Sequence, residues 1–473
     1  MSFWGRRKAF DSHTKVEADR QLKKTLSWPH LVALGIGGII GTGIYTLTGI
    51  GAERAGPAVI VAFAACGVLC LCAALTYAEM ATLVPASGSA YTYTYATLGE
   101  VLAWIVGWSL VLEYAVTCAA VAVGWSGYMV GLLHSAGIDL PPWLLSGPHA
   151  GGLINLPAVL ITFAVTALLL QGAKESATVN IVLVAIKIVA LGLFVFITIQ
   201  GINPDNYAPF MPYGFSSHVE DGTVRGVMAA AAIVFFAFFG FDAVSTSAEE
   251  VKDPKRDLTI GIIGSMVICT IIYMVVSACA VGAWPFHEFG VSNEPLAFIL
   301  RSMGHPWSAA AIGVAAILAL PSVILVMMYG QTRVFFVMAR DGLLPRGLSR
   351  LSGESKAPVA MTLLVGGFVA LIAGFFRLDQ IAELSNAGTL TAFLAVAVCV
   401  MVLRVTKPEV PRLFKTPLVW VVAPLTVAGC IYFMASLPAA TVIRFFIWNL
   451  IGLVIYFLYG RVKSELATNP AAE

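Results

Sequence analysis

Charged residues are scarce in this chain. Asp, Glu, Lys and Arg together make up 11% of its 473 residues, whereas 59% are hydrophobic. Charged residues are about a quarter of an ordinary soluble domain, so this composition excludes that class and indicates a membrane protein with many spans. The net charge of only +2 gives no general attraction to nucleic acid. No nucleic-acid partner is therefore expected.

Metal-binding and catalytic patterns are also missing. The eight cysteines lie in apolar stretches, and none is spaced with a histidine as metal ligands are. The seven histidines fall in termini, loops or the ends of apolar segments. We therefore expect no enzyme, no metal site and no bound cofactor. The basic, polar N-terminus lacks an apolar signal core, so a cleaved signal peptide is not expected.

Long apolar runs recur from Pro29 onward. Each approaches the ~20 residues that a membrane helix needs, so we predict an all-α polytopic protein with about twelve transmembrane helices in the lipid bilayer. A cytoplasmic arm, 1–28, precedes them and a cytoplasmic tail, 462–473, follows them. The expected spans are 29–50, 57–84, 96–133, 155–172, 175–201, 223–248, 258–284, 294–329, 357–377, 380–404, 415–436 and 439–461.

Basic residues are distributed unevenly between alternate connections. With the N-terminus inside, most of the 28 Lys and Arg residues fall on the inner side. The positive-inside rule therefore predicts cytoplasmic termini for a plasma-membrane protein. The longest inner connection, 330–356, mixes basic and apolar residues. It predicts an amphipathic helix on the membrane surface.

Residues 35–43 (Gly-Ile-Gly-Gly-Ile-Ile-Gly-Thr-Gly) lie in the middle of the first span. Five glycines in nine residues allow the helix to open there. Unpaired backbone groups are costly in hydrocarbon, so an opening is expected only where it lines a cavity. Our hypothesis is a small-molecule site. The alternative is a small-residue face for close helix packing.

A second interruption is expected in the sixth span, at 235–245. Gly240 is suited to end one half-helix, and Asp242 is suited to cap the first amides of the next. For Asp242 we favour this capping role over direct contact with a substrate. Spans 1 and 6 run in opposite directions. Broken helices at matching places in two halves are typical of inverted-repeat transporters with a site at the midplane.

The two breaks predict the chemistry of the substrate. The outer half of span 1 begins at its break and presents free amides, which form an anion site for a carboxylate, at Gly41, Thr42 and Gly43. The outer half of span 6 ends at its break and presents carbonyl oxygens, which suit an α-ammonium, near Phe236, Ala237 and Phe239. Together they describe an amino acid zwitterion.

Two ionisable residues lie well inside apolar spans, where such residues are functional candidates. Desolvation disfavours the charge of Lys187 in span 5, whereas a nearby carbonyl favours it, so this group is suited to gain and lose a proton. Glu113 in span 3 has three interpretations: binding a cationic side chain, relaying protons, or pairing structurally. Glu79, Glu249 and Glu250 lie near inner span ends and are expected in gates or salt bridges.

Several stretches resemble one family of transporters. They are 35–43, 85–93, 108–114, 235–256, 331–333 and 338–345. With these motifs the chain is similar to the amino acid–polyamine–organocation superfamily, in its bacterial cationic amino acid transporter branch. The resemblance covers essentially all the expected spans.

This resemblance implies two inverted five-helix repeats, spans 1–5 and 6–10, with two helices appended. The transporter core would be 29–404, with repeats 29–201 and 223–404, and the appended spans would occupy 405–461. The resemblance also implies alternating access, in which spans 1, 2, 6 and 7 move as a bundle against a scaffold.

Residue roles follow from the same resemblance. Lys187 matches a lysine that replaces the sodium site of related transporters, and its implied partner is the backbone of the inner half of span 1. Phe239 is larger than the isoleucine common in similar proteins and would reshape the pocket. The implied substrate contacts are Ile39, Ile40, Thr42, Gly43, Phe236, Ala237, Phe238 and Phe239.

We therefore expect a secondary active transporter that imports L-amino acids by proton-coupled symport, with the proton as coupling ion. An amino acid exchanger would share these motifs, and a non-transporting amino acid sensor is a further alternative. Glu113 favours a cationic substrate if its carboxylate reaches the pocket, whereas Ile40, Phe236 and Phe239 favour a small neutral one. The sequence leaves open whether a small accessory membrane subunit joins the chain.

Overall fold

The computed structural model describes residues 6–8, 23–135, 137–148, 151–171, 173–220, 223–290, 292, 294–351, 358–376, 378–437 and 439–468. Over these residues helices dominate, and a single antiparallel hairpin of two three-residue strands supplies the sheet. Most of the expected arm, 1–28, and the last residues of the expected tail, 462–473, lie outside the described residues. The predicted all-α membrane fold is confirmed.

The elements of the first half of the chain follow the expected spans closely. They are α1 (Trp28–Ile39), α2 (Thr42–Tyr45), α3 (Leu47–Ala55), η3 (Gly56–Ala58), α4 (Val59–Leu83), α5 (Ala90–Thr97), α6 (Glu100–Ser135), η4 (Pro142–Leu144), α7 (Leu156–Leu169), α8 (Ala173–Thr198), η6 (Ile199–Gly201) and η7 (Pro204–Tyr207).

The second half begins with the hairpin. Its elements are β1 (His218–Glu220), β2 (Thr223–Arg225), α9 (Val227–Val234), η8 (Phe235–Phe238), α10 (Ala243–Thr246), η9 (Ala248–Glu250), α11 (Pro254–Ala283), α12 (Phe286–Phe289), α13 (Pro295–Ser302), α14 (Pro306–Ala319), α15 (Pro321–Arg340), η10 (Arg346–Ser349), α16 (Val359–Phe375), α17 (Leu378–Thr406), α18 (Val419–Ala435), α19 (Ala439–Ile455), the π-helical turn η11 (Tyr456–Gly460), α20 (Arg461–Lys463) and α21 (Glu465–Thr468).

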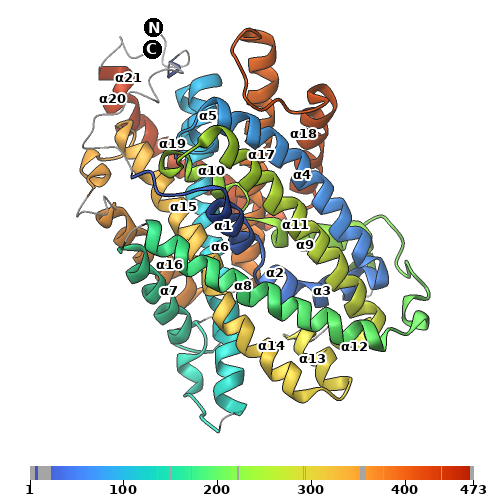
Figure 1. Cartoon of the computed structure of the whole chain (residues 1–473). Coiled ribbons are helices and arrows are strands. Elements are labelled where there is room, and N and C mark those ends of the chain that lie inside the picture. The colour runs from blue at the N-terminus through green and yellow to red at the C-terminus, as the bar shows by residue number, and fades with distance from the viewer. Residues whose placement is uncertain are drawn as a thin grey trace.

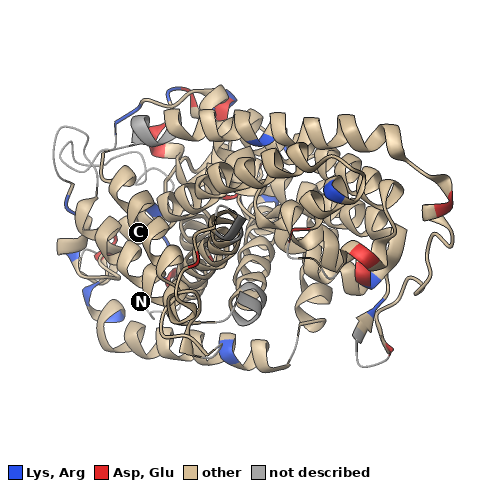
Figure 2. Ribbon diagram, turned by 90° about the horizontal axis from the view of Figure 1, so that it is seen from below, with Lys and Arg blue, Asp and Glu red and all other residues tan. Residues whose placement is uncertain are grey.

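Eight of the described helical stretches are long and apolar enough to cross a membrane, and four shorter apolar helices accompany them. Figure 2 shows long runs of the helical ribbon without a charged residue. The chain is therefore a multi-pass membrane protein. Described residues near its two ends are in contact, because Arg6 donates a hydrogen bond to the Arg461 carbonyl (3.0 Å).

The first broken span occupies the middle of the molecule. In Figure 1, α1 lies centrally, with α6, α8, α11 and α15 around it. It contacts α8, α11 and α15 directly. The glycines of 35–43 have two uses. Gly41 lies in the break, whereas Gly35, Gly37 and Gly38 lie inside α1 and are buried. The opening and the close-packing interpretations are thus each correct, at different residues.

The two broken spans cross by direct contact of their backbones. A Cβ atom on Gly38 would meet the Cα and carbonyl oxygen of Gly240, and a Cβ on Gly240 would overlap Gly38 in return. Gly240 also has φ +112°, a conformation that L-residues with a side chain rarely adopt. Both conditions require glycine at this crossing.

The expected surface helix within 330–356 is wrong. Residues 331–340 instead form the end of α15, and all ten are buried. The reason is charge pairing: Arg333 and Arg340 lie against Glu250 and Glu249, each at 2.8 Å, so neither arginine needs solvent. The eighth span is correspondingly displaced, since α14 and α15 together cover 306–340 rather than 294–329.

The crossing of the two breaks predicts the effect of adding one methyl group. Gly240→Ala strains the backbone and overlaps Gly38, so we expect it to lower the stability of the folded protein by about 2 kcal/mol or more. Gly192→Ala is the matched control, because a Cβ there meets nothing within 4 Å. Thermal unfolding in detergent measures both. Equal Tm values for the two variants would contradict the crossing.

Candidate substrate and coupling site

The helix of span 1 opens over two residues. Ile40 has an extended backbone (φ −74°, ψ 100°), and Gly41 follows with φ −146° and ψ −149°. The first backbone bond of α2 runs from the Ile44 N–H to the Gly41 carbonyl (3.2 Å). The amides of Thr42 and Gly43 precede that bond, so they are the orphan donors of this half-helix.

Span 6 opens at the matching place. After η8 the chain is extended at Phe239 (φ −66°, ψ 148°) and turns at Gly240. The chain then closes α10 with its own backbone, because Ala243 N–H donates to the Gly240 carbonyl and Val244 N–H to the Phe241 carbonyl, each at 3.2 Å. The predicted break in span 6 is present.

A second contact joins the breaks. A Cβ on Gly43 would overlap the Cα and Cβ of Ala237, so α2 and η8 touch without an intervening side chain. Tyr273 of α11 lies beside this contact. Its hydroxyl is 2.6 Å from the Ile39 carbonyl and 2.9 Å from the Ala237 carbonyl. One donor therefore serves the opened ends of both helices.

Lys187 of α8 is fully buried against the same break. Its Nζ donates to the Gly37 carbonyl (2.8 Å) and to the Ile40 carbonyl. Both acceptors belong to the end of α1, where helix carbonyls have no intrahelical partner. The Ser322 hydroxyl of α15 also lies 3.2 Å from the Gly37 carbonyl. The expected contact of Lys187 with the span 1 backbone is confirmed.

Comparison with known protein families identifies this architecture. Residues 26–461 match the family model described as amino acid permease. The chain belongs to the amino acid permease family. This is a family of transporters within the superfamily that the motifs indicated, so the expectation that the chain is not an enzyme is also supported.

Three relatives of the permease illustrate the range of the family. This chain is 47% identical over 452 residues to the branched-chain amino acid permease BcaP of Bacillus subtilis (strain 168), and the matched region covers 95% of each chain. It is 41% identical over 469 residues to the methylthioribose transporter of the same organism, over 98% of this chain and all of the other. It is 38% identical over 410 residues to the vacuolar cationic amino acid transporter 4 of Arabidopsis thaliana, over 85% of this chain and 67% of the other.

The expected substrate-contacting residues divide into two groups in the permease. Ile40 lies in the opened stretch of span 1. At the break of span 6, Phe236 and Phe239 pack together with ring centroids 5.1 Å apart. Phe238 instead packs into the interface with α4 and α11, 6.2 Å from the Phe63 ring and 5.2 Å from the Tyr273 ring. The structure therefore places Phe238 in the core.

The predicted capping role of Asp242 is wrong. Its side chain makes no capping bond to α10, because backbone carbonyls already accept from the first amides of that helix. The Asp242 carboxylate instead accepts a hydrogen bond from the Tyr114 hydroxyl of α6 (2.6 Å). Asp242 thus joins span 6 to span 3.

Glu113 also turns toward a neighbouring helix. One carboxylate oxygen accepts a hydrogen bond from the Thr389 hydroxyl of α17 (2.5 Å). Its Cβ lies against Gly388, whose own Cβ would overlap it. This hydrogen bond of Glu113 joins α6 to α17, and among the described residues its second carboxylate oxygen is buried without a hydrogen-bond partner. Farther along α6, Gly124 meets Thr42 at the break.

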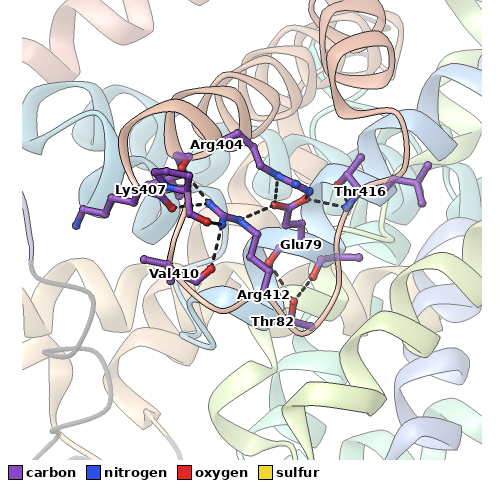
Figure 3. Close-up of polar contacts among 11 residues, drawn as sticks. Glu79, Thr82, Arg404, Lys407, Val410, Arg412 and Thr416 are labelled. Atoms are coloured by element: carbon purple, nitrogen blue, oxygen red, sulfur yellow. Dashed lines mark hydrogen bonds and ion pairs between the residues drawn. The ribbon is translucent and has the colours of Figure 1, made fainter.

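The three glutamates near the inner span ends form the expected ion pairs. Figure 3 shows the Glu79 carboxylate between Arg404 and Arg412, at 2.8 and 3.1 Å, with the Thr416 amide donating to it at 2.8 Å. These contacts tie α4 to the end of α17 and to the chain before α18. With the pairs Glu249–Arg340 and Glu250–Arg333, the salt-bridge interpretation of these glutamates is confirmed.

Tyr273 is a residue of this site that is not among those predicted from the sequence. It is a fully buried hydroxyl in the middle of an apolar helix of 30 residues. A polar group at such a depth is itself a signal, since it needs a partner inside the membrane. The partners, however, lie 234 and 36 residues away, and no local pattern indicates them.

The bridging hydroxyl gives a second prediction. Tyr273→Phe keeps the ring but leaves the two carbonyls without this donor, so we expect a loss of about 1–3 kcal/mol in stability. Tyr432→Phe, at a tyrosine that is 49% exposed, is the control and should change little. Thermal unfolding of both variants in detergent measures the difference. If Tyr273→Phe unfolds like the wild type, the bridge contributes nothing.

Proposed function

We propose that this permease imports a neutral L-amino acid with an apolar side chain, by symport with a proton. The observation that carries the proposal is the meeting of the two breaks, where orphan amides of one span lie beside the opened carbonyl end of the other. A zwitterion is the ligand that satisfies both. The family supports an amino acid as the substrate.

The backbone recognises the part common to all amino acids. The amides of Gly41, Thr42 and Gly43 bind the carboxylate, as helix N-termini bind anions. The ammonium meets the carbonyl end of η8, near Phe236 and Phe239, because Tyr273 already donates to the Ala237 carbonyl.

The side chain of the substrate meets apolar walls. Ile40, Phe236 and Phe239 supply them, and Val323 of α15 packs directly against Gly41. We assign Glu113 to the contact between α6 and α17 rather than to this wall, since its bonded oxygen faces Thr389 and its Cβ faces Gly388. The branched-chain permease relative supports this choice of substrate over a cationic one.

Lys187 couples the proton to movement. Its ammonium holds the Gly37 and Ile40 carbonyls, so protonation favours the present position of α1 against α8. Loss of the proton weakens that hold and releases the half-helix, with spans 1, 2, 6 and 7 moving as one bundle in alternating access. The repeats 29–201 and 223–404 supply the two halves, and the appended spans are 405–461. The excess of basic residues on one side supports cytoplasmic termini.

A thermal-shift screen of the purified permease tests the substrate. Ligand at about 100 times its Kd adds about 2.7 kcal/mol of stability. We expect leucine, isoleucine and valine to raise Tm, and arginine and lysine not to. Stabilisation by arginine or lysine would overturn the apolar pocket and return Glu113 to it. Stabilisation by methylthioribose alone would overturn the zwitterion and favour the chemistry named for the second relative.

Substitution of Lys187 tests the coupling. Lys187→Ala and Lys187→Met should abolish accumulation of labelled leucine in proteoliposomes with an imposed pH gradient, acid outside. Both should keep exchange of internal for external leucine, which needs no net proton movement. Lys415→Ala, at an exposed lysine, is the control and should accumulate leucine normally.

Three results would contradict this mechanism. Accumulation by Lys187→Ala that still follows the pH gradient would remove Lys187 from the coupling. Exchange without accumulation in the wild type would show an obligate exchanger, and binding without either activity would indicate a sensor.

A further inference from the structure

The face of α8 that carries Lys187 also carries an asparagine. Asn180 precedes Lys187 by seven residues, which is two helical turns, so both side chains point the same way. Both are buried, with 1% and 0% of their surface exposed. The Asn180 side-chain amide donates to the Ala33 carbonyl of α1 at 2.8 Å. Asn180 thus bonds α1 one turn before the Gly37 carbonyl that Lys187 holds.

The fit between Asn180 and α1 is close. A Cβ on Gly37 would overlap the side-chain amide of Asn180, so the two helices touch there without a side chain from α1. Within the described part of the chain, the Asn180 Oδ1 is buried and accepts no hydrogen bond. Asn180 therefore holds α1 by one hydrogen bond, and its side-chain oxygen remains available as an acceptor.

Asn386 of α17 repeats this arrangement on the other broken span. Its side-chain amide donates to the Ala232 carbonyl of α9 at 3.4 Å. It too is buried, and over the described residues its Oδ1 likewise has no donor. Ala33 lies eight residues before Gly41, and Ala232 lies eight residues before Gly240. Each asparagine therefore grips the first half of a broken span at the same distance from its break.

The residue two turns after each asparagine also faces a break. Seven residues after Asn386 is Phe393, which packs on Phe235 and Phe241 with ring centroids 6.3 and 5.0 Å apart. Phe393 thus takes the place that Lys187 has on α8, with an apolar ring in place of an ammonium. The two sites are alike in their asparagine and differ in the group beside it.

We propose that Asn180 and Asn386 are an equivalent pair of positioning residues, each of which sets the register of one half-helix on its neighbour. Asn180 aligns α1 so that the Gly37 and Ile40 carbonyls face Lys187. Asn386 aligns α9 so that η8 meets α2 at Ala237. A single hydrogen bond suits such a contact, because it fixes a position and still breaks when the half-helix moves. The consequences for transport rest on the proposed function, whereas the structural pairing does not.

Hydrogen–deuterium exchange of the purified full chain tests the pairing. Asn180→Leu, which keeps the size of the side chain but removes its donor, should speed exchange in Trp28–Ile39 by about fivefold, the effect of one modest hydrogen bond. It should leave Val227–Val234 unchanged. Asn386→Leu should do the reverse. Asn449→Leu is the matched control. Asn449 donates to the Phe445 carbonyl of its own helix (3.0 Å) and accepts from the Ser109 hydroxyl of α6 (3.1 Å), and neither partner belongs to the two segments, so it should change neither.

The pH dependence of transport separates positioning from mere packing. Asn180→Leu presents the carbonyls to Lys187 less well, so half-maximal uptake of labelled leucine should move about half a pH unit or more toward acid. Among the described residues, the titratable neighbour of Lys187 is the Cys269 thiol of α11, and it is unchanged in every variant. Asn386→Leu should lower the rate of uptake without moving its pH midpoint, because Phe393 carries no proton.

Each outcome decides the proposal. Exchange that rises equally in both segments for either variant, or in neither, would overturn the pairing. Unchanged pH midpoints with the expected exchange pattern would overturn the link from Asn180 to Lys187. Absence of leucine uptake by the wild type would instead count against the proposed function, and exchange would still test the pairing. If a Leu variant fails to fold, the Ala variant, which needs no added volume, replaces it.

Discussion

The structure depends on two opened helices that cross at the level of their backbones. Gly38 meets Gly240, and Gly43 meets Ala237, so no side chain separates the breaks. Opened backbone inside a membrane is stable only where other groups satisfy it. The crossing therefore determines which helices surround it, because each must bring a donor or an apolar surface to the opened ends.

Three helices bring those donors. Lys187 comes from α8, Tyr273 from α11 and Ser322 from α15, and all three bond carbonyls at the end of α1. Farther from the crossing, ion pairs satisfy the buried polar groups. Arg333 and Arg340 enter the protein on α15 only because Glu250 and Glu249 meet them. These donors and ion pairs are thus each placed against a specific acceptor, and apolar side chains pack around them.

The sequence predicts a structural feature when the residues that cause it lie close together in the chain. The breaks are local, because glycine density and an aspartate after Gly240 are visible within ten residues. The contact of Lys187 with span 1 was available through the family resemblance. The partners of Asp242, Glu113 and Tyr273 were not, since Tyr114, Thr389 and Ile39 lie 128, 276 and 234 residues away. The burial of 331–340 could not be predicted for the same reason. Its basic residues taken alone indicate a surface, and their acidic partners lie far away in the chain.

The donors at the end of α1 are not equivalent, and this bears on how a proton acts. Tyr273 and Ser322 are neutral, and their bonds do not depend on a change of charge. The Gly37 carbonyl has a second, neutral donor within reach, the Ser322 hydroxyl at 3.2 Å, which also lies 2.9 Å from the Ala319 carbonyl of its own helix. Among the described residues, the Ile40 carbonyl has Lys187 as its one donor. A change of charge on Lys187 therefore acts most directly on Ile40, the residue that precedes the amides proposed to bind the substrate carboxylate. Proton and substrate would meet across a single opened turn.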